Sequence, residues 1–271
     1  MSFVLLHGLG ADRRQPLDLF GPVLGAPDAD GPARDRRGVV APDVRAHGAS
    51  PLVGGPADFA LDRLADEIAA EVVAEPGDAA SRGGNAPRRP ITLVGISMGA
   101  AIALRIALRG LLPVERAVFV RPAFGDVSLP PNLRAFPVIG ELLREHGPRG
   151  GAERFARTDP YLRVAEASPI GGRGLLAQFQ ATDAARRAIR LVEIPRNRAF
   201  ASDAELGGLA SRGIRSLVVG APRDPVHPFE LAERWAAGLG ADFARVPARD
   251  DGQAAQTATM RDTVAGWLSR S

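Results

Sequence analysis

The sequence predicts an α/β fold built on a parallel sheet. Short apolar segments typical of buried strands alternate with longer amphipathic segments typical of helices. About six strands are expected on this pattern, at residues 3–6, 39–41, 91–94, 117–120, 216–219 and 243–246. Residues 91–108 are the most informative, because a strand, a glycine-flanked turn and a small-residue helix follow one another directly. A chain of 271 residues can bury one sizeable core.

The composition is that of a globular protein with little net charge. Hydrophobic residues make up 45% of the chain and charged residues 24%, and the formal net charge is +3. No apolar run approaches the roughly 18 residues of a transmembrane helix. The first residues lack the basic and apolar regions of a signal peptide, so we expect a cytoplasmic protein that does not bind membranes. The absence of cysteine excludes disulfides and thiolate catalysis.

All of the basic residues are arginines, since the sequence contains no lysine. They are interleaved with acids and form no basic block, and no aromatic platform lies beside them. We therefore do not expect binding to nucleic acid.

Five helical segments are expected to flank the sheet. The one beginning near Asp58 has a possible N-cap and places Leu61, Leu64, Ile68 and Val72 on one face. Residues 75–90 are rich in glycine, proline, serine and arginine, and they are expected to form a surface loop. The other four segments are 15–24, 100–108, 228–238 and 257–268.

Residues 124–201 differ in character from the rest of the chain. Short helical stretches are broken by proline and glycine, and no strand pattern is visible. We predict that residues 124–201 form a helical lid inserted into a core made of residues 1–123 and 202–271. The helical stretches are expected at 138–145, 152–157, 174–179 and 183–192.

The sequence Gly95-Ile96-Ser97-Met98-Gly99 has the form of a nucleophile elbow. A sharp strand-to-helix turn strains the serine backbone, lifts its hydroxyl above the sheet and directs the helix N-terminus at a developing oxyanion. In a chain with 31 glycines the five-residue pattern alone can arise by chance. The apolar strand before it and the small-residue helix after it favour the elbow.

Together with this elbow, three further motifs resemble the α/β-hydrolase superfamily over essentially the whole chain. They are His7-Gly8 after the first strand, the segment 43–50 (DVRAHGAS) after the second, and 220–228 (GAPRDPVHP) after the penultimate strand. The resemblance implies an α/β-hydrolase fold flanked by helices. Family members usually carry two strands ahead of the His-Gly turn, whereas here a single apolar run, 3–6, precedes it. We therefore expect a minimal, mostly parallel sheet of about six strands.

The resemblance also implies roles for individual residues. Ser97 would be the nucleophile, and the backbone amides of Leu9 and Met98 would form the oxyanion hole. Asp224 would be the acid that orients a histidine. A family variant places this acid where Asp126 stands, but the Gly-x-x-x-Asp-Pro pattern favours Asp224. By the same resemblance, two of the histidines, His7 and His47, are expected to fix loops.

The histidine that should activate the serine is missing from its usual place. The family carries it just after the last strand, where residues 246–253 here read VPARDDGQ, and no histidine follows His227. A neutral serine is a poor nucleophile until a base takes its proton. Three explanations remain open.

In the first explanation Asp250 or Asp251 is the base, paired with Asp224 so that repulsion between the two carboxylates raises the pKa of one of them.

In the second explanation His227 turns in from its own loop to act as the base. In the third there is no base, and Ser97 with its oxyanion site binds a carbonyl without acyl-enzyme turnover. Loss of the base from a triad lowers the rate by several orders of magnitude. The third explanation therefore suits a non-hydrolytic reaction or a pure binding role.

Arginines follow five of the expected strands at the edge of the sheet where ligands bind in open parallel sheets. Guanidinium groups pointing inward there would attract a carboxylate or phosphate. Arg121 and Arg223 are expected to lie nearest the cleft. The others in this set are Arg13, Arg14, Arg45 and Arg249.

The sequence thus predicts an enzyme acting on a small carbonyl compound, an ester, thioester or lactone, and the strand-end arginines favour an anionic one. The alternative is a non-hydrolytic relative, such as a lyase, isomerase or cyclase, or a ligand-binding pseudo-hydrolase. We expect no cofactor and no metal. The histidines show no ligand spacing, and residues 7–10 (HGLG) lack the third glycine of a dinucleotide motif.

Overall fold

The computed structural model describes residues 2–25, 38–74 and 90–270. Apart from Pro90, the loop expected at 75–90 lies outside these residues. The central element is a six-stranded sheet in the order β2-β1-β3-β4-β5-β6 with every neighbouring pair parallel. The predicted fold class and the six strands are confirmed. The strands are β1 (Ser2–Leu6), β2 (Val39–Val40), β3 (Ile91–Ile96), β4 (Val114–Val120), β5 (Arg215–Gly220) and β6 (Asp242–Arg245).

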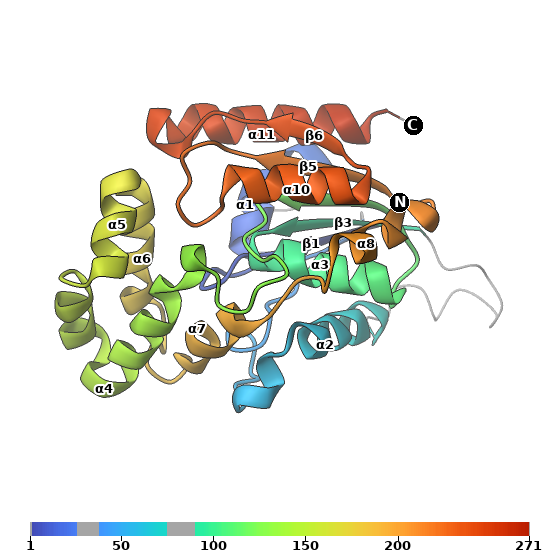
Figure 1. Cartoon of the computed structure of the whole chain (residues 1–271). Coiled ribbons are helices and arrows are strands. Elements are labelled where there is room, and N and C mark those ends of the chain that lie inside the picture. The colour runs from blue at the N-terminus through green and yellow to red at the C-terminus, as the bar shows by residue number, and fades with distance from the viewer. Residues whose placement is uncertain (1, 26–37, 75–89, 271) are drawn as a thin grey trace.

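Helices cover both faces of the sheet (Figure 1). One face packs against α1 (Arg14–Leu24) and α11 (Gln253–Leu268), through buried side chains such as Phe20 and Trp267. The other face packs against α2 (Leu61–Ala74), α3 (Met98–Arg109) and α10 (Phe229–Leu239). The inner strands are largely apolar because a parallel sheet is buried on both sides, whereas the edge strand β6 is mostly exposed. Among the described residues, no helix is long and apolar enough to cross a membrane.

Helix α2 begins later than the sequence indicates. Asp58 lies inside a short 3-10 helix, η1 (Pro56–Phe59), where its carboxylate accepts a hydrogen bond from the Gly55 amide at 2.9 Å. The first amide of α2, at Leu61, instead donates to Oδ1 of Asn197 at 3.0 Å. The expected N-cap at Asp58 is therefore wrong, because a side chain distant in sequence satisfies the helix end.

The chain between β4 and β5 is helical throughout its ordered elements. The stretches expected at 138–145 and 152–157 are joined in α4, which is broken only at Gly147, where φ is 68°. Helix α5 was not expected; Thr158 caps it by accepting from the Tyr161 amide. The elements are η2 (Pro131–Leu133), α4 (Ala135–Phe155), α5 (Asp159–Ala167), α6 (Pro169–Ala177), η3 (Gln178–Gln180), α7 (Ile189–Glu193), η4 (Ile194–Arg196), α8 (Asp203–Leu206) and α9 (Gly208–Ser211).

Two glycines allow β3, α3 and β1 to approach one another closely. A Cβ on Gly99 would overlap the carbonyl oxygen of Leu6 and lie 2.8 Å from that of His7. A Cβ on Gly95 would overlap the carbonyl of Gly99 itself. The turn between β3 and α3 can therefore be this sharp only when both positions lack a side chain.

We predict that Gly99→Ala destabilises the protein by about 1–3 kcal/mol, since the added methyl group overpacks a backbone contact. Gly266→Ala is the matched control: it lies in α11 with nothing within 4 Å of its added Cβ. Alanine there should stabilise by about 0.5–1 kcal/mol. Urea unfolding measures both, and equal stability of the two variants would contradict the close approach at Gly99.

Candidate active site

Ser97 lies at the turn between β3 and α3 in a backbone conformation that non-glycine residues rarely adopt. Its φ is 55° and its ψ is −110°, and its amide donates to the carbonyl of Val120 at 2.9 Å. This strain is what the expected turn requires. Ser97 is 9% exposed and opens on a cavity of about 280 Å³. Within the described part of the chain, its hydroxyl makes no hydrogen bond to protein.

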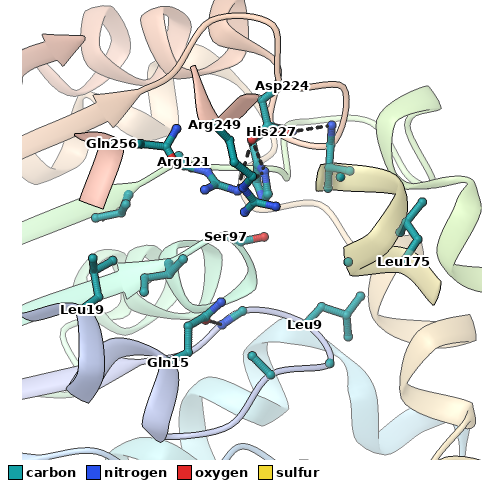
Figure 2. A pocket seen from close by; sticks show the side chains of 18 of the residues that line it. Leu9, Gln15, Leu19, Ser97, Arg121, Leu175, Asp224, His227, Arg249 and Gln256 are labelled. Carbon is teal, nitrogen blue, oxygen red and sulfur yellow. Dashed lines mark hydrogen bonds and ion pairs between the residues drawn. The ribbon is translucent and has the colours of Figure 1, made fainter. Parts of the chain in front are cut away.

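The cavity lies between the carboxyl ends of the strands and the helical segment that follows β4. Helix α6 and η3 contribute Gly171, Gly174, Leu175 and Gln178 to its wall, and α4 contributes Phe136. Figure 2 shows Arg121, Asp224, His227 and Arg249 on one side of Ser97, with Leu9 and Gln15 on the other. The polar part of the cavity wall also includes Gln253, Gln256 and Thr257 of α11.

Two backbone amides beside Ser97 are free to donate. In residues 2–25, 38–74 and 90–270, neither the Leu9 nor the Met98 amide makes a hydrogen bond to protein. The loop that carries Leu9 is held by Gln15, whose Oε1 accepts from the Gly8 amide at 2.7 Å. Met98 is the first residue of α3, so its amide belongs to the positive end of that helix. The two amides lie where an anionic oxygen would be favoured.

Asp224, His227 and Arg121 form a buried cluster in the cavity wall. The His227 Nδ1 lies 3.0 Å from Asp224 Oδ2, and Nη2 of Arg121 lies 3.1 Å from the same oxygen and 3.0 Å from His227 Nδ1. The other Asp224 oxygen accepts from the amides of Val226 and His227, both at 3.0 Å. The loop after β5 thus folds back on its own carboxylate, which brings His227 into the cavity.

The cluster holds Asp224 ionised and His227 neutral. Burial raises the pKa of Asp224, but the charge that His227 carries when it is protonated and the charge of Arg121 outweigh this effect and hold the pKa far below its ordinary value. Burial lowers the pKa of His227, opposed by Asp224 and reinforced by the charges of Arg121 and Arg249. An ionised carboxylate can only accept, so its contact with His227 favours the tautomer that carries the proton on Nδ1 and leaves Nε2 unprotonated.

Arg249 is the feature of this site that the sequence expectations understated. It follows β6 in the turn where the family carries its histidine, and its guanidinium enters the cavity above Ser97 (Figure 2). No acid within the described residues pairs with it. Its charge nevertheless lowers the pKa of Arg121, although burial is the main cause of that pKa of about 10. The sequence signal for Arg249 was its position in the turn shortly after the last strand, β6, which ends at Arg245.

Three of the residues expected at the site lie elsewhere. The Asp250 carboxylate accepts from the Ser168 hydroxyl and from the Ile170 amide at 3.0 Å, so it fixes the start of α6. Asp251 and Arg223 form an ion pair, with 55% and 64% of their side chains exposed. None of the three lines the cavity. The structure therefore does not bring Asp250, Asp251 or Arg223 to Ser97.

The alternative acid, Asp126, is also outside the cavity. Its two oxygens accept from Nη1 and Nη2 of Arg234, each at 2.8 Å, and the hydrogen bonds to Arg234 lower the pKa of this carboxyl. Nε of Arg234 contacts Asp203, also at 2.8 Å. Asp126 therefore serves a clamp between the start and the end of the helical segment, and Asp224 is the acid that faces Ser97.

His7 and His47 hold loops behind the site. Nε2 of His7 accepts from the Val44 amide at 3.0 Å, so its Nδ1 carries the proton and donates to the Gly8 carbonyl at 2.9 Å. His47 donates from Nδ1 to the Arg45 carbonyl at 2.8 Å. Burial lowers the pKa of both rings. Arg45 itself pairs with Glu67 and faces away from the cavity.

Comparison with known proteins identifies the family. Residues 3–265 match the model of the alpha/beta hydrolase family, so the chain belongs to that family. No curated protein matches the sequence at a significant level.

Solved structures with the same fold include several hydrolases. A hydrolase from Pseudomonas aeruginosa PA01 superposes with a TM-score of 0.65 at 20% identity, over 98% of this chain and 89% of that one. The enol-lactonase from Burkholderia xenovorans LB400 gives 0.64 at 19% identity, over 99% and 91%. An alpha/beta hydrolase from a Medee basin deep-sea metagenome library gives 0.67 at 16% identity, over 100% and 90%. Identities this low establish the shared fold alone.

We predict that the pKa of His227 lies below the ordinary histidine value of about 6.5 and rises in Arg249→Gln, because that change removes a nearby positive charge. Arg223→Gln is the control, since its guanidinium is paired with Asp251 at the surface. An NMR titration of the imidazole resonances measures both. A pKa of His227 that responds equally to the two substitutions would contradict the position of Arg249.

Proposed function

We propose that the protein is a serine hydrolase of small carbonyl compounds in which His227 replaces the family histidine as the base. The observation that carries the proposal is that His227, hydrogen-bonded to Asp224, shares one small cavity with Ser97. Acid and base would then come from the same loop after β5. A cavity of about 280 Å³ suits a small ester, thioester or lactone.

The reaction follows from the roles of these groups. The Ser97 oxygen attacks the carbonyl carbon while its proton passes to Nε2 of His227. The amides of Leu9 and Met98 stabilise the oxyanion of the tetrahedral intermediate. Collapse expels the alcohol or thiol, which takes the proton from His227 and leaves an acyl group on Ser97. Water attacks the acyl group by the same route and releases the carboxylic acid.

Asp224 and Arg121 would set the pKa of His227, and Asp224 would also set which of its nitrogens carries the proton. The carboxylate would keep the proton on Nδ1, which leaves Nε2 unprotonated and able to accept the serine proton. Because burial lowers the pKa of His227, the ring stays neutral to a more acidic pH than an exposed histidine does, and activity should decline only when the base becomes protonated.

We predict that Ser97→Ala and His227→Ala each lower kcat for p-nitrophenyl butyrate by roughly 10³-fold or more, because the nucleophile and the base act as a unit. Asp251→Ala is the control and should leave kcat unchanged. Labelling of Ser97 by a fluorophosphonate probe should be lost in His227→Ala and retained in Asp251→Ala. Retained labelling in His227→Ala, or equal turnover by Ser97→Ala and wild type, would exclude this mechanism.

The alternative is a non-hydrolytic enzyme or a ligand-binding protein, and one contact favours it. Nη2 of Arg121 lies 3.0 Å from His227 Nδ1. If the ring proton shifts to Nε2, Nδ1 accepts from Arg121 and His227 can no longer take the serine proton. The site would then bind a carbonyl compound without forming an acyl-enzyme. A protein whose Ser97 resists fluorophosphonate but still binds small carbonyl ligands would support this alternative.

We further infer that the substrate is anionic and that Arg249 binds its negative group. Two guanidinium groups and one carboxylate face the cavity, and Arg121 is already paired with that carboxylate. Arg249 is the remaining cation there. A guanidinium matches a carboxylate or phosphate with two parallel hydrogen bonds.

We predict that Arg249→Gln lowers kcat/KM for mono-p-nitrophenyl succinate, which carries a carboxylate, by roughly 10- to 100-fold, as the loss of a charge-assisted hydrogen bond implies. The neutral p-nitrophenyl butyrate should change only a few-fold. Arg223→Gln should affect neither ester. If Arg249→Gln lowers turnover of both esters equally, Arg249 has another role and the proposed anionic substrate is wrong, although a Ser97-dependent hydrolase would remain.

A further inference from the structure

A second cavity, of about 590 Å³, adjoins the Ser97 cavity at the loop that follows β1. The two cavities share Gly10, Ala11 and Gln15 in their walls. The second is lined further by the 43–49 loop after β2 and by the segment 180–190. We propose that this second cavity, around Arg187 and Arg190, binds a small oxyanion such as phosphate or the phosphoryl or carboxylate group of a larger molecule.

The burial of Arg190 without a carboxylate partner, within the described residues, is the observation that carries the proposal. This arginine is 3% exposed, and within the described residues no carboxylate pairs with it. Its Nη1 donates to the Arg187 carbonyl at 2.9 Å, while its Nε is buried without a partner. An unpaired charge buried in this way is strongly destabilising unless something compensates it. Burial, followed by the charge of Arg187, lowers the pKa of Arg190 to about 10, and no acid acts in the other direction.

Arg187 adds a second cation to the same wall. Its Nη1 donates to the Gly48 carbonyl at 2.7 Å, which fixes the guanidinium beside the cavity, and its Nε is also buried without a partner. The charge of Arg187 disfavours the charged form of Arg190, as expected for two guanidinium groups that repel each other. An oxyanion between them would remove this repulsion and accept from several N–H groups.

The acids of this cavity are already engaged with backbone amides. Both oxygens of Asp43 accept, one from the Arg13 amide and one from the Ala49 amide, each at 2.8 Å. Asp12 accepts from the Arg14 amide at 2.9 Å. Neither acid forms an ion pair with Arg187 or Arg190 among the described residues. These carboxylates order the loops of the cavity and leave the two arginines for a ligand.

The experiment is a titration with inorganic phosphate, followed by calorimetry and by thermal unfolding. It is done in the Arg249→Gln background, so that an anion bound in the Ser97 cavity does not contribute. Arg187→Gln and Arg190→Gln test the site. Arg186→Gln is the matched control, because its side chain comes from the same segment but is 67% exposed and does not line the cavity.

We expect the Arg249→Gln protein to bind phosphate and to unfold at a higher temperature as phosphate is added. Addition of Arg186→Gln should leave this response intact, whereas Arg187→Gln should weaken binding at least tenfold. Arg190→Gln should abolish the response and, without phosphate, raise the melting temperature, because it removes an uncompensated buried charge. If Arg190→Gln does not fold, Arg187→Gln alone decides.

Absence of phosphate binding, or equal weakening by Arg186→Gln and Arg187→Gln, would overturn the proposal. A second measurement separates the two sources of the oxyanion. Phosphate is added to the wild-type protein during ester turnover. If phosphate inhibits turnover and Arg187→Gln removes this inhibition, the second cavity binds the distal anionic group of a substrate. Binding without competition would indicate a separate ligand, and both results support an oxyanion site.

Discussion

The backbone contact between Gly99 and the end of β1 is the constraint on which the site depends. Because neither Gly95 nor Gly99 carries a side chain, α3 begins directly against the carbonyls of Leu6 and His7. This contact sets three things at once: the strained backbone of Ser97, the direction of the α3 N-terminus and the position of the loop that carries Leu9. The positions of the Leu9 and Met98 amides and of the Ser97 side chain therefore all depend on this one backbone contact.

The electrostatics of the site depend on charged side chains in the cavity wall rather than on the backbone contact. A buried carboxylate, Asp224, is surrounded by Arg121, by two amides and by His227, so it stays ionised and holds the ring. Arg249 then adds a positive charge that no acid among the described residues pairs with. The result is a small chamber in which a neutral imidazole lies beside fixed cations. Such a chamber favours negative charge on whatever occupies it, whether that charge belongs to a bound ligand or develops during a reaction.

The sheet, the flanking helices and the turn at Ser97 could be predicted from the sequence. The spacing of apolar residues and of glycines predicts them, because both depend only on residues that are close together in the chain. The helical segment was harder. Prolines interrupt the helical pattern of the sequence there, whereas in the structure Pro160 and Pro169 each lie in the first turn of a helix, whose N-caps are Thr158 and Ser168. Side-chain direction in the site was harder still. Arg223 and Arg249 both follow strands, and only the three-dimensional course of each loop decides that the second enters the cavity and the first pairs with Asp251.

The clamp made by Arg234 has a consequence for how this architecture varies. One guanidinium holds Asp126, where the helical segment leaves the sheet, and Asp203, where it returns. The two ends of the segment are therefore fixed close together, independently of what lies between them. A segment with so narrow a base can be lengthened, shortened or exchanged without moving the strands, since the entropy of closing a loop grows only slowly with its length. The clamp makes the roof of the Ser97 cavity a replaceable module, so that selectivity can diverge while the sheet and its turn stay constant.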